Sequence, residues 1–180
     1  MKIQSLLIVF VACCALVSSG CKSEPMSSTP AANPKSTAAP GQPAALPDNA
    51  FKASITLVDA PAKLRVGQKQ TIQVRVKNAS DATWYARGAE INTNADNKFY
   101  LAVGNRWLNA ADEQMVTAMD GRYGLPRNLK PGEETEVPLQ ITAPKDPGDY
   151  VLDVDLVQEQ VAWFHDKGSA TARAKVSVVR

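Results

Sequence analysis

His165 is the only histidine of the 180-residue chain, and Asp166 and Ser169 lie close behind it. A histidine, a carboxylate and a serine are the side chains of a hydrolytic triad. Residues so close together on a strand or tight turn rarely reach that geometry, and the chain contains no nucleophile-elbow or oxyanion motif. We therefore expect no enzyme, although a deep pocket that held His165 beside a carboxylate would favour one.

Four carboxylates lie close together in the C-terminal part of the chain: Asp149, Asp153, Asp155 and Glu159. Calcium needs about six or more oxygen ligands that converge from loops. Asp153 and Asp155 share one face of a predicted strand, where a solvated ladder paired with Arg or Lys is more usual. One histidine without a cysteine partner does not build an ordinary zinc site, and glycine-rich phosphate motifs are absent. We expect neither a metal nor another cofactor.

The three tryptophans have different expected surroundings. Trp107 lies an even number of residues from the apolar residues of the strand predicted over 99–103. It should therefore point to the same face, which places it in the core. Trp84 is expected to close one end of the fold. Trp163 and Phe164 are neighbours, and adjacent strand residues point to opposite faces. An exposed ring there would be a platform for a sugar or a protein. Trp163 and Phe164 are the predicted binding residues, and packing of the pair beneath a loop is the alternative.

The first 20 residues are predicted to be a cleaved signal peptide. Lys2 precedes an apolar segment over 3–16, and the small residues 18–20 lead directly to Cys21. The apolar segment is too short for a permanent membrane-spanning helix, and the small residues are typical of a cleavage site. Because the chain's other two cysteines lie inside this segment, cleavage would leave Cys21 as the one cysteine of the mature chain.

The segment from Leu16 to Cys21 resembles the lipobox of bacterial lipoproteins, with Ser18 where the pattern prefers Leu. This resemblance implies that a lipid thioether forms on Cys21 and that cleavage leaves this residue first in the chain. Several acyl chains anchor a protein stably in a membrane, whereas a single one is marginal. Lys22 follows in place of the Asp that retains lipoproteins in the inner membrane, which implies the outer membrane. An ordinary signal peptide with an incidental cysteine is the alternative.

Residues 21–50 are predicted to be a disordered tether. Six of the chain's twelve prolines lie in it, mostly among Ala, Ser and Thr, and its large apolar residues are Met26 and Leu46. Such a segment cannot bury enough apolar surface to offset the entropy lost on ordering. The formal net charge of +2, without a basic cluster, argues against nucleic acid as a partner.

Residues 51–180 are predicted to form one all-β domain. Turn-forming pairs such as Pro131-Gly132 and Pro147-Gly148 separate its segments. The alternation of apolar and polar residues indicates antiparallel strands with one dry and one wet face, so we expect a two-sheet sandwich. Pro138 should lie on an edge strand or at a bulge, because it cannot donate to a ladder. The alternating segments are 72–76, 137–141, 152–156 and 172–178.

Several short motifs of this domain are similar to those of Ig-like modules in bacterial envelope and polysaccharide-associated proteins. The similarity spans most of residues 70–180. It implies an Ig-like sandwich with a binding or spacing role, directed at glycans, and no known chemistry. The motifs are Val76 to Ser80 followed by Trp84, Asp120 to Arg122, Leu125 to Gly132, Ala143-Pro144, Pro147 to Tyr150, and Trp163-Phe164 with Gly168.

Together these features predict a non-enzymatic envelope lipoprotein, held at the membrane by its N-terminal lipid, that presents an Ig-like module to a glycan or an envelope partner. The alternative is a structural or assembly accessory that docks on another envelope protein and binds no small ligand. Aromatic side chains in a concave face would favour glycan binding. A flat apolar patch or a long bare edge strand would favour protein docking.

Overall fold

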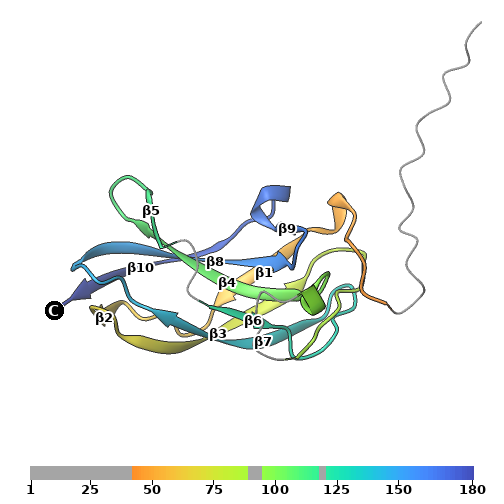
Figure 1. Cartoon of the computed structure of the whole chain (residues 1–180), viewed down its shortest axis with the longest axis horizontal. Helices are drawn as coiled ribbons and strands as arrows, with labels where there is room; N and C mark the ends of the chain where they lie inside the picture. The colour runs from red at the N-terminus through yellow and green to blue at the C-terminus, as the bar shows by residue number, and fades with distance from the viewer. Residues whose placement is uncertain (1–41, 89–94, 118–120) are drawn as a thin grey trace, which may run out of the picture. The chain divides into compact units, whose positions relative to one another are not determined.

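The computed structural model describes residues 42–88, 95–117 and 121–180, and Figure 1 shows their arrangement. The predicted signal peptide, Cys21 and most of the predicted tether lie outside these residues. None of the helices in the described ranges is long and apolar enough to cross a membrane.

The described chain folds into ten strands and three short 3-10 helices. The strands are β1 (Ala53–Leu57), β2 (Lys63–Arg65), β3 (Lys69–Asn78), β4 (Leu101–Asn109), β5 (Met115–Thr117), β6 (Arg122–Gly124), β7 (Glu134–Thr142), β8 (Gly148–Gln158), β9 (Ala162–Trp163) and β10 (Ala172–Val179). The 3-10 helices are η1 (Asp48–Ala50), η2 (Ala95–Asn97) and η3 (His165–Lys167).

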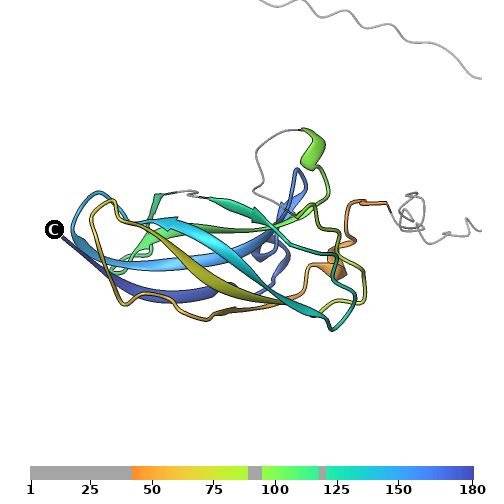
Figure 2. The same cartoon turned by 90° about the horizontal axis from the view of Figure 1, so that it is seen from below.

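The strands form two sheets that pack face to face. The smaller sheet has the order β1-β3-β7, and the larger has the order β2-β10-β8-β4-β5, with β6 paired to β4 and β9 paired to β8. Figure 2 shows β3 and β7 of the smaller sheet crossing over the longer strands of the larger one. The predicted all-β, Ig-like two-sheet sandwich is confirmed.

One strand pair departs from the predicted antiparallel pattern. β2 runs parallel to β10, with Leu64 opposite Val178. The chain passes from the smaller sheet to the larger between β1 and β2. β2 therefore joins the free edge of β10 instead of forming a hairpin with β1.

Alternating apolar residues of both sheets fill the space between them. Val137, Leu139 and Ile141 of β7 are fully buried, as their alternation with polar residues predicts. β7 is an edge strand of the smaller sheet, so the predicted edge position of Pro138 is also confirmed.

The two tryptophans predicted to be structural lie in this core. Trp84 and Trp107 are both fully buried. Trp107 packs edge-on against Tyr150, with 6.4 Å between ring centroids. Trp84 forms an isolated antiparallel bridge with Leu129.

Residues of the predicted tether before Phe51 also contact the domain. The side-chain amide of Gln158 donates to the carbonyl of Ala44 at 2.8 Å and accepts the backbone N–H of Leu46 at 2.9 Å. Ala50 is fully buried. The composition of the segment could not predict these contacts, because Gln158, which lies far away in sequence, forms the hydrogen bonds to the backbone of Ala44 and Leu46.

Candidate functional site

The outer face of the larger sheet carries charged side chains that are unusually well buried. Ladder partners lie directly opposite each other and point to the same face. Arg106 is paired with Asp153, and Gly104 with Asp155. Asp153 and Asp155 are only 1% and 3% exposed. The predicted solvated ladder is therefore wrong in its burial. Arg106 and Arg173 lie against the carboxylate of Asp153, and His165 of η3 lies against that of Asp155.

These side chains surround a cavity of about 320 Å³. A volume near 300 Å³ is at the lower end of the range for small-molecule sites. The walls come from β4, β5, β6, β8, β9 and η3, so no single segment of the sequence contains the site. The polar and aromatic residues that line it include Arg106, Arg122, Asp155, Trp163, His165 and Asp166.

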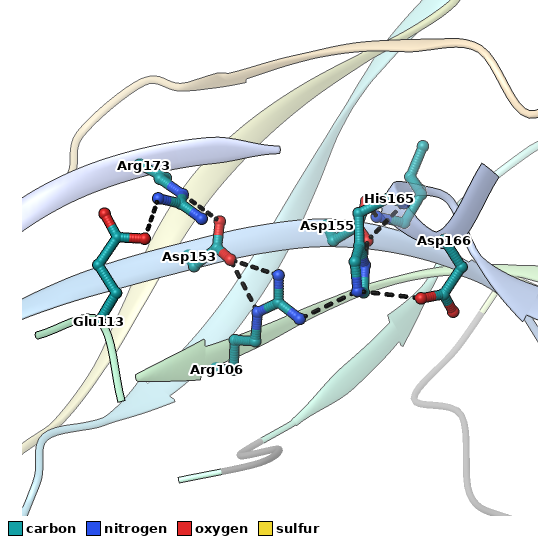
Figure 3. A network of polar contacts seen from close by, with 8 residues as sticks. Arg106, Glu113, Asp153, Asp155, His165, Asp166 and Arg173 are labelled. Atoms are coloured by element: carbon teal, nitrogen blue, oxygen red, sulfur yellow. Dashed lines mark hydrogen bonds and ion pairs between the residues drawn. The ribbon is translucent and has the colours of Figure 1, made fainter. Parts of the chain in front are cut away.

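A chain of ion pairs runs along one wall of the cavity (Figure 3). Arg106 holds one carboxylate oxygen of Asp153 through Nε and Nη2, both at 2.7 Å. Arg173 approaches the other oxygen at 3.2 Å and also pairs with Glu113 at 3.2 Å. The expectation that Asp153 pairs with Arg is confirmed. Two guanidinium groups thus satisfy a carboxylate that would be costly to bury alone.

His165 joins this chain to two further carboxylates. Its Nδ1 lies 2.6 Å from Oδ2 of Asp155, and its backbone N–H donates to the same oxygen at 3.1 Å. Its Nε2 lies 3.1 Å from Nη1 of Arg106 and 3.2 Å from Oδ1 of Asp166. η3 begins at His165, and its end at Gly168 has the left-handed conformation (φ 85°) that glycine allows.

A cavity that holds His165 beside carboxylates is the arrangement that would favour an enzyme, and the described residues bring no nucleophile to the histidine. Of the described residues that line the cavity, none is Ser, Thr, Cys or Lys. The hydroxyl oxygen of Ser169 accepts the backbone N–H of Ala53 at 3.1 Å. When the ring is neutral with its hydrogen on Nδ1, Nη1 of Arg106, 3.1 Å away, donates to the Nε2 lone pair that a general base would use.

Burial changes the proton affinity of two carboxylates in this region. Desolvation raises the pKa of Asp155, and the hydrogen bonds from His165 oppose this shift. Desolvation likewise raises the pKa of Glu159 against the attraction of Arg122. Both carboxylates are therefore held in surroundings that favour the neutral acid more than water does.

The two predicted binding residues separate in the structure. Phe164 is fully buried, and its ring packs edge-on against Phe51 and Trp84 at centroid distances of 5.0 and 5.2 Å. Phe164 therefore has the packing role that was the alternative, and its ring forms no exposed platform. Trp163 is half-buried and lines the cavity, so a binding role for it stays a prediction.

Trp163 stands between the cavity and a second hollow on the same face. The guanidinium carbon of Arg122 lies over its ring, 5.1 Å from the centroid. Both residues also line the second hollow, of about 380 Å³. There Arg122 donates to Glu159 at 2.7 Å, while its Nε and the Oε1 of Glu159 find no hydrogen-bond partner within the described ranges.

The sequence reasoning missed Gly104, Arg106 and Arg122. The detectable signal was Gly104, because a glycine within a strand often marks a close approach of another group. The two arginines gave no signal of their own, since an arginine on an alternating strand normally faces water.

The described residues hold no group of three or more His, Cys, Asp or Glu side chains placed to bind a metal ion.

Comparisons with known proteins give no family for the chain. No family model matches it, and no curated protein matches it.

Some solved structures are similar to the chain at a low level. The β-glucosidase of Listeria innocua, solved in complex with glucose, has a TM-score of 0.43 at 14% identity. The match covers 72% of this chain and 16% of that enzyme. The CARDB domain of the PF1109 protein from Pyrococcus furiosus, solved with di-metal ions, has a TM-score of 0.40 at 17% identity, covering 71% of this chain and 91% of that domain. Spo0M, a sporulation control protein from Bacillus subtilis, has a TM-score of 0.38 at 16% identity, covering 72% of this chain and 49% of that one. Similarity this low transfers neither a ligand nor an activity.

Proposed function

We propose that this protein is a non-enzymatic envelope lipoprotein, anchored through Cys21 in the outer membrane, whose Ig-like domain binds a glycan in the Trp163 cavity. The anchor rests on the lipobox-like segment of the sequence. The ligand class rests on the composition of the cavity wall.

The observation that carries the proposal is the combination of Trp163 with unused donors and acceptors around one cavity. Arg106 is engaged through one N–H on each of its three nitrogens, and Arg122 through Nη1. Nε of Arg122 has no hydrogen-bond partner among the described residues, and the guanidinium of Arg106 has two N–H bonds beyond these three. Asp166, whose side chain is 54% exposed, supplies acceptor oxygens.

A pyranose ring fits this mixture of groups. Its C–H bonds suit an aromatic wall, and its hydroxyls both donate and accept, so they can satisfy guanidinium and carboxylate groups at once. Each cationic group of the wall already has a carboxylate partner: Arg106 has Asp153 and Arg122 has Glu159. A wall that compensates its own charge favours an uncharged saccharide.

A second candidate function has one observation in its favour. Val116 on β5 is 47% exposed, and β5 is the edge of the larger sheet. The neighbouring residue Met115 is 58% exposed and also lines the cavity. This is the kind of surface on which a structural or assembly accessory would dock. The strand has only three residues, which is short for a docking edge.

The experiment is a glycan-array screen and a pull-down from envelope extract with the full chain. The strongest neutral glycan is then titrated against Trp163→Ala and the matched control Tyr85→Ala, an aromatic residue outside the cavity wall. Trp163→Ala should weaken binding roughly tenfold or more, since aromatic anchors dominate such interfaces, while Tyr85→Ala should bind normally. Retained binding in Trp163→Ala would place the site elsewhere. Capture of a protein that Val116→Asp abolishes, with no glycan bound, would support docking instead.

A further inference from the structure

Nε2 of His165 lies between a group that can only donate a hydrogen bond and one that, when ionised, can only accept. Arg106 reaches it through Nη1 at 3.1 Å, and Asp166 through Oδ1 at 3.2 Å. A guanidinium group has no acceptor, and a carboxylate has no donor. Nε2 carries either one lone pair or one hydrogen. It can therefore form a hydrogen bond with only one of these neighbours at a time.

The protonation state of the imidazole decides which neighbour Nε2 bonds to. A neutral ring carries one N–H, and the short 2.6 Å contact from Nδ1 to the buried Asp155 places it on Nδ1. Nε2 is then an acceptor, which suits Arg106. A protonated ring carries a hydrogen on both nitrogens, so Nε2 becomes a donor and suits Asp166.

The groups around His165 make this exchange feasible. The carboxylates on its two sides outnumber the one guanidinium that touches it, and that guanidinium keeps its own carboxylate, Asp153, in either state. Trp163 adds a ring whose centroid lies 6.4 Å from that of the imidazole. The charged groups that face His165 or line the same cavity are Asp153 and Asp155 of β8, Arg106 of β4, Arg122 of β6 and Asp166 of η3.

We propose that His165 is a proton-operated switch of the cavity, whose Nε2 exchanges Arg106 for Asp166 when the ring gains a proton. The exchange releases an Nη1–H bond of Arg106 and adds one positive charge to the wall. A ligand rich in acceptor oxygens then binds more tightly in acid than in base. Only this last consequence rests on the proposed function, because the exchange itself needs no ligand.

The test is made on the full chain without ligand, where the single histidine gives one set of ring signals. In ¹⁵N-labelled protein at alkaline pH, Nδ1 should appear protonated and Nε2 unprotonated. At a pH low enough to protonate the ring, the hydrogen on Nε2 should be visible because its bond to Asp166 slows exchange with solvent. Crystal structures at both pH values should show Nη1 of Arg106 on Nε2 only in the alkaline form.

Two variants separate the switch from a histidine that is merely structural. In Asp166→Ala the acid-form Nε2 hydrogen should exchange with water too fast to be seen, while the matched control Asp81→Ala should keep it. A neutral ring protonated on Nε2, an acid crystal with Arg106 still on Nε2, or a protected Nε2 hydrogen in Asp166→Ala would each overturn the proposal. If the switch is found and no glycan binds, the proposed function fails and the switch stands.

Discussion

The indole of Trp163 lies against the bare backbone of Gly104. A β-carbon at position 104 would lie 2.9 Å from Cη2 and 3.2 Å from Cζ3 of the ring, and 3.4 Å from the carbonyl oxygen of Gly121. Contacts below 3.0 Å are not tolerated by real side chains, so the absence of a side chain at Gly104 sets how closely the ring approaches β4.

Gly104→Ala should therefore disturb the cavity. Overfilling a packed site lowers the free energy of unfolding by about 1–3 kcal/mol. Here the added β-carbon should push the Trp163 ring away from the strand. We expect a lower melting temperature and weaker binding of any cavity ligand. Gly148→Ala is the matched control, because its β-carbon would meet only ordinary contacts with Tyr150 at 3.4 Å. Equal behaviour of the two variants would show that Gly104 does not position the indole.

The sandwich could be predicted because its signal is local. Leu152, Val154 and Leu156 alternate with polar residues, and all three are fully buried. The same alternation predicted that Asp153 and Asp155 are exposed to solvent, which is wrong. The alternation sets the face to which a side chain points, but it does not show whether other residues cover that face. Asp153 is buried against Arg106 and Arg173, and Asp155 against His165 of η3. These are tertiary contacts that no local pattern contains.

The candidate site could be predicted only in part for the same reason. Neighbouring strand residues point to opposite faces, which anticipated that Trp163 and Phe164 would separate. Which of them lies inside depends on the pocket that Phe51 and Trp84 form for Phe164, and no local pattern reports that pocket.

The two aromatic neighbours should respond differently to truncation. Phe164→Ala removes a fully buried ring and should cost about 3–5 kcal/mol of unfolding free energy. Trp163→Ala should cost clearly less, because its ring is half-buried, and should mainly weaken ligand binding. Denaturant unfolding of both variants measures the difference. Similar large losses in both would make Trp163 a packing residue and remove it from the site.

Asn105 provides a test of an unsatisfied polar group. It lies opposite Val154 in the ladder and two residues before Trp107, so it belongs to the core-facing row of β4, and it also borders the cavity. It is 2% exposed, and neither polar atom of its amide has a hydrogen-bond partner among the described residues. Leaving such groups unpaired costs about 1–3 kcal/mol, so Asn105→Val should raise the melting temperature. A lower melting temperature would indicate that buried water satisfies the amide.

Cys21→Ser tests the predicted anchor, which lies outside the described residues. If a lipid is attached at Cys21, the variant should lose partitioning into the detergent phase and appear as soluble or uncleaved protein. Cys14→Ser is the matched control, because that cysteine lies within the predicted signal peptide and should leave partitioning unchanged. Detergent-phase partitioning that survives in Cys21→Ser would rule out the lipoprotein prediction.

Glu159→Gln should change how stability depends on pH. Because desolvation raises the pKa of Glu159 in the folded protein, the fold favours its neutral form. Its stabilising contribution is full below the unfolded pKa of about 4.3 and is lost as the pH rises through the raised folded value. Gln resembles the neutral acid and does not titrate, so the stability of the variant relative to the wild type should increase over that rise. Denaturant unfolding across the pH range measures this difference, with Glu136→Gln, a half-exposed partner of Arg75, as the control. A relative stability that falls with rising pH would mean that the attraction of Arg122 outweighs the desolvation of Glu159.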